Sequence, residues 1–185
     1  MKEVATSRRI ALVVEYDGTN YAGFQYQAND ASIQEELEKA VARLTLTKVR
    51  ISGAGRTDAG VHAKAQVVAF TTESVMSCDT FTRGLNHFLP QDIAVKAVYG
   101  VPPEFDPRRH ARSRRYRYTV LCKATRSPLE ERYAYRVPEA LDRQAMGNAL
   151  RCIEGVHDFA HLGMSGGPGK STVREVMRTC IWQQD

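Results

Sequence analysis

Apolar and polar residues along the first half of the chain follow patterns that predict four strands and two helices. The run IALVVEY (10–16) is apolar and β-branched, which is typical of a buried strand. Residues 32–44 place their apolar side chains on one helical face, and Ser32 with Glu35 forms a capping box. The expected elements are, in order, strand 10–16, helix 32–44, strand 48–55, strand 65–73, helix 78–90 and strand 93–101.

The order β-α-β-β-α-β predicts an α+β fold built on a ferredoxin-like unit. Such a unit has a four-stranded antiparallel sheet with two helices on one face and an open second face. Strands 48–55 and 65–73 would form a hairpin whose connection contains GAGRTDAGVHA (53–63). We therefore expect residues 1–105 to form an N-terminal ferredoxin-like domain that carries this connection.

The second half of the sequence repeats only part of this pattern. Residues 114–121 predict a strand with Tyr116, Tyr118 and Val120 on one face, and residues 172–182 predict another strand. Between them, 140–155 predicts a helix with Gly155 as its C-cap. We expect residues 106–185 to form a second, incomplete ferredoxin-like unit of strand, helix and strand, which indicates that the chain is a partial product with an unpaired sheet edge.

Composition limits the class of protein. The chain has 43% hydrophobic and 25% charged residues, which is ordinary for a globular protein, and no apolar run reaches the ~18 residues that span a bilayer. Glu15 and Asp17 interrupt the first apolar run, which argues against a secretory signal. The four cysteines form no CxxC pair, so we expect buried thiols in a reducing cytoplasm rather than disulfides or a zinc site.

Positive charge is concentrated in one segment. The net charge is +5, and RRHARSRRYRY (108–118) combines arginines with two tyrosines. Arginines that neutralise phosphate beside aromatic rings that stack on bases indicate a nucleic-acid surface, and the alternative is a solvated charged face. The candidate RNA-binding residues are Arg108, Arg109, Arg112, Arg114 and Arg115.

Three other motifs argue against alternative chemistries. GGPGKST (166–172) lacks the first glycine of a phosphate-binding loop and precedes a strand, so we expect a surface loop. His157 and His161 have no obvious third ligand, so no metal site is expected. His62 adjoins the Asp58 segment without a Ser or Cys nucleophile, and Thr57 is expected to point elsewhere.

Asp58 has three possible roles by residue chemistry alone. A structural aspartate would pair with Arg56 or with turn amides. A metal ligand would need further carboxylates nearby, and the sequence supplies none there. A nucleophile would need an electrophilic carbon, a partner that keeps it ionised, and a dry pocket.

The segment GAGRTDAGVHA resembles the active-site motif of the tRNA pseudouridine synthase A family. Four other segments match that family in the same order: EYDGTNYAGFQYQ (15–27), SIQEELEKAV (32–41), LNHFLPQDIAV (85–95) and RRYRY (114–118). The resemblance as a whole extends from about residue 9 to residue 182. The resemblance implies a pseudouridine synthase fold and an isomerase that converts uridine to pseudouridine in tRNA, at uridines 38 to 40 of the anticodon stem-loop.

The resemblance also implies residue roles. Asp58 would be the essential catalytic aspartate; whether it attacks the ribose, attacks the base or abstracts a proton stays open. Arg56 would enter the RNA helix where the flipped base left and help to position Asp58, and Tyr116 would stack on the uracil. The arginine-rich run would line the RNA cleft. No metal or organic cofactor is implied, and the family works as a homodimer.

The sequence departs from the family pattern in two places. Family members continue beyond the last strand, through a part that carries a basic partner of the aspartate and apolar residues closing the uracil pocket. Phe24 stands where the family usually has Trp. The alternative functions are a non-catalytic RNA-binding fragment and a homologue that acts on another RNA.

Overall fold

The computed structural model describes residues 7–162 and 171–183. The chain divides into two compact units, Met1–Tyr116 and Arg117–Asp185. The expected domain boundary at 105/106 stays a prediction, because a grouping of contacts need not coincide with the limits of a domain. Within the described ranges, no helix is both long and apolar enough to cross a membrane.

The first unit contains the four strands and two helices that the hydrophobic pattern predicts, in the predicted order. They are β1 (Arg8–Tyr16), α1 (Ile33–Thr45), β2 (Ser52–Gly53), β3 (Ala63–Thr72), α2 (Cys78–Phe88) and β4 (Ile93–Val101). The predicted cap of α1 is confirmed in part, since the Ser32 side chain accepts the Glu35 backbone N–H. Strand β2 is much shorter than the predicted 48–55, because only two of its residues pair with β3.

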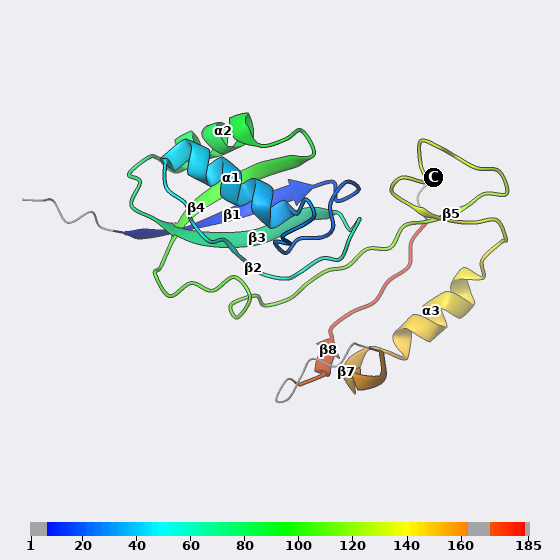
Figure 1. The fold of residues 1–185 in the computed structure, drawn as a ribbon. Coiled ribbons are helices and arrows are strands. Elements are labelled where there is room, and N and C mark those ends of the chain that lie inside the picture. Colours follow the sequence, from blue (N-terminus) through cyan, green and yellow to red (C-terminus); the bar gives the residue numbers. More distant parts are fainter. Residues whose placement is uncertain (1–6, 163–170, 184–185) are drawn as a thin grey trace, which may run out of the picture. The chain divides into compact units, whose positions relative to one another are not determined.

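The four strands form one antiparallel sheet in the order β2-β3-β1-β4. Strand β1 is central and pairs along its length with both β3 and β4; Leu12, for example, lies between Val68 and Val98. Helices α1 and α2 lie on the same face of this sheet (Figure 1). The β2–β3 pair is the predicted hairpin, and its connection carries Asp58.

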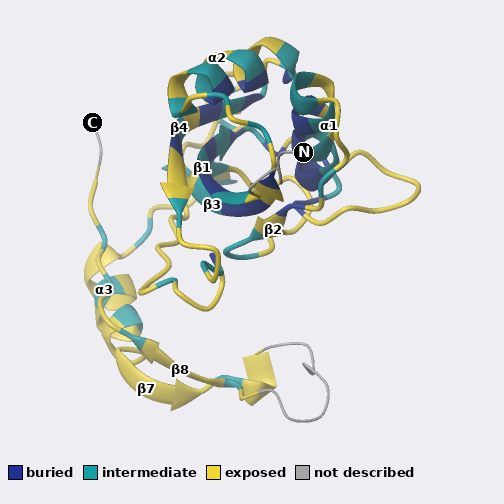
Figure 2. Cartoon of the chain, turned by 90° about the vertical axis from the view of Figure 1, so that its left-hand side faces the viewer, coloured by how far each residue is buried: buried dark blue, intermediate teal, exposed yellow. Residues whose placement is uncertain are grey.

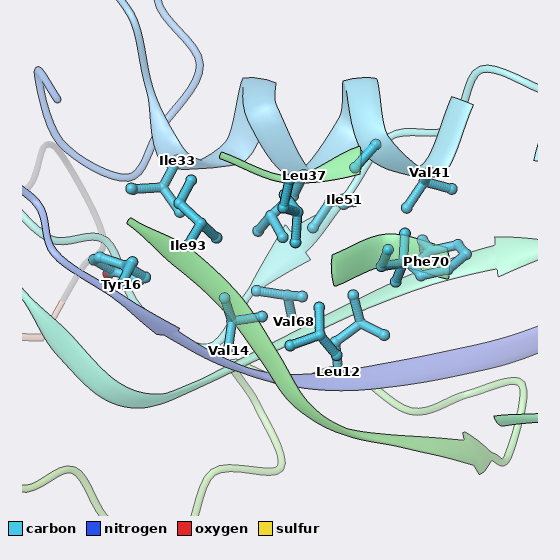
Figure 3. Packing of buried hydrophobic residues seen from close by; sticks show 14 of the residues in the cluster. Leu12, Val14, Tyr16, Ile33, Leu37, Val41, Ile51, Val68, Phe70 and Ile93 are labelled. Carbon is cyan, nitrogen blue, oxygen red and sulfur yellow. The ribbon is translucent and has the colours of Figure 1, made fainter. Parts of the chain in front are cut away.

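The hydrophobic core lies between the sheet and the two helices. Alternate residues of β1 point into it, and they meet the apolar face of α1 formed by Ile33, Leu37 and Val41 (Figure 3). The rings of Phe70 and Phe81 meet edge to face with centroids 6.1 Å apart. Each fully buried large side chain of this kind stabilises the unit by about 1.5–3 kcal/mol, so the core fixes the sheet that carries the site.

The second face of the sheet is partly covered, although the sequence predicted an open face. Ala11 and Ala69 face each other across β1 and β3 and are only 4% and 0% exposed. Arg9 donates from Nε to the backbone oxygen of Phe105 at 3.2 Å. The chain after β4 passes along the side of the sheet away from the helices (Figure 1), which brings residues 102–116 back across the unit.

The second unit differs from the predicted strand, helix and strand. Its elements are β5 (Val120–Cys122), β6 (Tyr135–Val137), α3 (Arg143–Arg151), β7 (Gly155–Asp158), the 3₁₀ helix η1 (Ala160–Leu162) and β8 (Val173–Val176). Strands β5 and β6 pair in parallel, and β7 and β8 pair antiparallel. The predicted strands 114–121 and 172–182 are therefore too long, because a strand persists only where a partner completes its hydrogen bonds.

Burial in the second unit is also lower than the pattern predicts. None of its described residues is buried, whereas dark blue marks buried parts of the first unit (Figure 2). The helix expected over 140–155 is the shorter α3, which buries no residue and ends at Arg151; Gly155 is not its C-cap but begins β7 with φ +99°. Three of the cysteines expected to be buried, Cys122, Cys152 and Cys180, are exposed.

Candidate active site

The site is built on the Asp58 loop, which we define as residues 54–62 between β2 and β3. Its backbone is fixed at several points. Ala54 N–H donates to the oxygen of Val67 at 2.8 Å, and Gln66 Nε2 donates to the oxygen of Gly55 at 2.7 Å. Because these bonds start from a sheet with a packed core, the loop has a defined path.

A second loop, residues 17–23, lies directly against the Asp58 loop. Phe24 N–H donates to the oxygen of Thr57 at 3.0 Å, next to Gly23. A Cβ on Gly23 would lie 2.7 Å from that Thr57 oxygen, and one on Gly18 would lie 2.1 Å from the oxygen of Val61. Two segments of the family resemblance, 15–27 and 53–63, are therefore in backbone contact. Glycine is required at positions 18 and 23, where the two backbones approach most closely.

Arg56 and Asp58 extend outward from the loop, on either side of Thr57. Both are exposed, whereas Thr57 is half-buried and its Oγ1 lies 2.9 Å from the Tyr16 hydroxyl. Among the described residues, neither the Arg56 nor the Asp58 side chain has a hydrogen bond or an ion pair. Within the described ranges, the Asp58 carboxylate therefore makes neither of the contacts expected for a structural aspartate, an ion pair with Arg56 or a hydrogen bond to a turn amide.

His62, at the end of the loop, has polar neighbours in the 17–23 loop. Its Nδ1 lies 3.0 Å from Asp17 Oδ1 and 3.1 Å from the Gly18 nitrogen. In the same 17–23 loop, the Tyr21 hydroxyl donates to Asp92 Oδ1 at 2.6 Å. Burial of the Tyr21 side chain, together with this carboxylate, raises the pKa of Tyr21. In the described ranges, no three His, Cys, Asp or Glu side chains gather closely enough to hold a metal ion.

The segment GGPGKST (166–172) is predicted from the sequence to be a surface loop. It lies largely outside the described residues.

The arginine-rich run adjoins the Asp58 loop through Arg114. Arg114 Nη2 donates to the oxygen of Ala54 at 2.7 Å and to that of Arg108 at 3.2 Å. At the start of the run, Asp106 Oδ1 accepts the backbone N–H groups of Arg108 and Arg109, and these bonds lower the pKa of that carboxyl. Arg114 thus holds this part of the run against the loop that presents Asp58.

The five candidate RNA-binding arginines are exposed, but they are not equivalent. Arg114 is held against the loop, and Arg109 lies 3.9 Å from Asp106. Arg112 and Arg115 have no ion pair or hydrogen bond to any described residue. Tyr116 is 73% exposed and makes no ring contact or hydrogen bond within the described ranges. It belongs to no strand, so the predicted strand face of Tyr116, Tyr118 and Val120 is wrong.

Two residues of the sheet that hold the loop, Tyr16 and Gln66, were not predicted from the sequence. Tyr16 reads as the end of a buried strand, and Gln66 as one polar position in the next strand. Their partners lie 41 and 11 residues away. No local pattern marks such contacts, because they arise only when β1 and β3 pair.

Comparison with known proteins agrees with this arrangement. The pattern of the tRNA pseudouridine synthase family matches residues 12–108, which include the second half of β1, the Asp58 loop and the start of the arginine-rich run. The chain is 46% identical over 169 residues to tRNA pseudouridine synthase A of Pelobacter propionicus, covering 91% of this chain and 69% of that relative.

Two further relatives have the same name. The Geobacter sp. (strain M21) protein is 46% identical over 177 residues, covering 96% of this chain and 72% of the relative. The Roseiflexus castenholzii protein is 46% identical over 183 residues, covering 96% and 67% respectively. With identity at this level along nearly the whole chain, and the family motif on an exposed, well-anchored loop, the chain belongs to the tRNA pseudouridine synthase family of isomerases.

Proposed function

We propose that this chain isomerises uridine to pseudouridine in tRNA, with Asp58 as the essential carboxylate. One observation carries the proposal. The Asp58 and Arg56 side chains extend into solvent from a loop with a defined path, and neither has a partner among the described residues. Groups held outward in this way, beside an arginine-rich run, are available to a substrate.

The reaction is an isomerisation: bonds are rearranged, and the product contains the same atoms as the substrate. The bond between N1 of uracil and C1′ of ribose breaks, the base turns, and a bond from C5 to C1′ forms. C5 loses a proton and N1 gains one, so no oxidant or reductant is needed. This balance agrees with a reaction that requires no cofactor. Asp58 acts in one of three ways: it attacks the ribose, attacks the base or abstracts a proton.

The neighbouring residues have roles in RNA binding under this proposal. A uridine inside a helical stem must leave its stack to be reached, and Arg56 fills the vacated position. Tyr116, whose ring is exposed, stacks on the uracil. Arg108, Arg109, Arg112, Arg114 and Arg115 contact phosphates, and RNA shape dominates recognition because the bases of an RNA helix lie in a deep groove.

The family resemblance supports further parts of the proposal. The substrate is the anticodon stem-loop, with uridines 38 to 40 as targets. The enzyme acts as a homodimer in the cytoplasm. Residues 1–105 form a ferredoxin-like domain, consistent with the strand order β2-β3-β1-β4, and residues 106–185 form part of a second one.

The test is pseudouridine formation by the purified chain on unmodified tRNA transcript, mapped by nucleotide. Asp58→Asn should lower turnover by at least about 10³-fold, because removal of an essential catalytic group has effects of this size or larger. It should not weaken tRNA binding. Asp30→Asn is the matched control, since Asp30 is also exposed and lies in the same unit; this variant should keep full activity.

The alternatives give different results in the same assay. A binding-only fragment would bind tRNA and convert no uridine with or without Asp58. A homologue specific for another RNA would leave the anticodon arm unmodified but convert uridine in total cellular RNA. Loss of both binding and folding in Asp58→Asn would indicate a structural aspartate.

A further inference from the structure

We propose that Tyr16 and Thr57 are positioning residues that direct Arg56 and Asp58 out of the loop through the hydrogen bond between their hydroxyl groups. This inference rests on the proposed function, because it concerns how the loop presents the carboxylate that acts on uridine. The two oxygens lie 2.9 Å apart.

The Thr57 side chain is the inward-pointing group at the centre of the loop. Between Gly55 and Gly60, where every residue is described, Thr57 is the only residue whose side chain has a hydrogen bond. Its neighbours on both sides are exposed while Thr57 is half-buried. Exposure thus alternates along residues 56–58, the pattern expected where neighbouring side chains point to opposite sides of the backbone. Fixing Thr57 inward therefore turns both Arg56 and Asp58 outward.

The Thr57 backbone is held from the same direction. Its oxygen accepts the Phe24 N–H at 3.0 Å, and the Phe24 ring lies 6.5 Å from the Tyr16 ring. The backbone bond fixes where Thr57 lies, and the hydroxyl bond fixes which way its side chain turns. Both contacts are needed to define the direction of the adjacent side chains.

Tyr16 is a rigid anchor because it belongs to the sheet rather than to a loop. It is the last residue of β1, it is 3% exposed, and it lies in the core cluster (Figure 3). Next to it, the pairing of β1 with β3 shifts, so Lys64 and Ala65 face the single residue Glu15. Such a bulge redirects a strand beside a functional loop.

The Tyr16 hydroxyl is suited to a permanent hydrogen bond. Burial raises the pKa of Tyr16, against the opposing effect of its hydrogen bonds to Thr57 and Gln66. The hydroxyl therefore stays neutral and protonated at the pH where tRNA enzymes work. Gln66 also holds the loop at Gly55, so the same region of the sheet supports both contacts.

The first experiment compares Thr57→Val, Thr57→Ser and Tyr16→Phe in steady-state conversion of tRNA. Thr57→Val and Tyr16→Phe each remove one hydroxyl, and each should lower kcat by about 10- to 100-fold, the effect expected when a catalytic group shifts by about 1 Å. The fall in kcat should exceed any rise in KM, and the tRNA dissociation constant should change little because the arginines proposed to contact phosphates are kept. Thr57→Ser keeps the hydroxyl and should restore most of kcat.

The double variant Thr57→Val with Tyr16→Phe tests the contact itself. It should lose no more activity than Tyr16→Phe alone, because the bond to Thr57 is already absent in that variant. Thr72→Val is the matched control: it removes a buried, hydrogen-bonded hydroxyl of the same unit that does not touch Thr57. This control should keep kcat within about twofold.

A second measurement does not depend on turnover. NMR relaxation of the loop amides should show increased mobility at Arg56 and Asp58 in Thr57→Val and Tyr16→Phe, with the remaining sheet unchanged. Normal order at these amides, or kcat unchanged in both variants, would overturn the inference.

The outcomes separate this inference from the proposed function. If Asp58→Asn is inactive while Thr57→Val and Tyr16→Phe are fully active, the function stands and the positioning role is wrong. If the unaltered chain converts no uridine in any RNA, the proposed function fails, and the relaxation data alone decide whether the bond orients the loop.

Discussion

Substitution of Gly23 by alanine should be one of the most damaging single-methyl changes in the first unit. Gly23 has φ +108°, in the region that L-residues rarely adopt. A Cβ there would also lie 2.7 Å from the Thr57 oxygen, which is too close for any real contact. Alanine must therefore either strain the backbone of residues 17–23 or push the Asp58 loop away.

The two effects can be given magnitudes. A non-glycine residue in a sparsely populated backbone region costs about 1–3 kcal/mol. Overpacking against a close neighbour costs about another 1–3 kcal/mol. Gly23→Ala should therefore lower the free energy of unfolding by about 2–6 kcal/mol. Turnover should fall as well, because the displaced atom belongs to the residue before Asp58.

Two other glycines separate strain from clash. Gly60 has φ +77° with no atom within 4 Å of its Cβ position, so Gly60→Ala should show only the strain of about 1–3 kcal/mol. Gly100 has neither feature, and Gly100→Ala should change stability by less than about 1 kcal/mol.

Urea unfolding of the three variants measures these differences in the free energy of unfolding, provided that the m-value is the same in each variant. If Gly23→Ala were no more destabilising than Gly60→Ala, the close approach of the two loops would carry no energetic cost. If it matched Gly100→Ala, the reasoning from both φ and distance would be refuted.

Two further predictions concern the arginine-rich run. Arg112→Gln should weaken tRNA binding and reduce the slope of log K against log salt by about 1, whereas Arg83→Gln on α2 should leave the slope unchanged; equal slopes for both would exclude a phosphate contact at Arg112. Because the pKa of Asp106 is lowered in the folded chain, its bonds are fully formed above the ordinary carboxyl range and are lost as pH falls through the lowered value. Amide protection at Arg108 and Arg109 should therefore decrease in acid, and Asp106→Asn should remove that dependence.

The local pattern of the sequence is enough to predict the elements of the first unit. The apolar positions of β1 and α1 follow periods of 2 and 3.6, and their side chains form the core as expected. The Ser32 cap marks the start of α1 because a cap depends only on residues within one turn. The motif around Asp58 likewise points to the family from a short segment, since its glycines and charged residues lie within eleven residues.

The second unit shows where local pattern is insufficient. Residues 114–121 alternate in a way that predicts extended backbone, yet only Val120–Cys122 form a strand. Alternation states which side chains share a face, but a strand also needs a partner for its hydrogen bonds. Helix α3 similarly buries no residue, because a helical pattern in the sequence does not by itself supply a surface that covers the helix.

The candidate site depends on both the local sequence pattern and the tertiary contacts. From the sequence alone, Arg56 and Asp58 are candidate site residues because of the family motif, and the arginines are candidates because they cluster in one segment. How these residues are held depends on tertiary contacts. Tyr16 reaches Thr57 across 41 residues, and Arg114 reaches Ala54 across 60. Such contacts leave no local trace, because they exist only once the strands have paired and the chain has returned across the sheet.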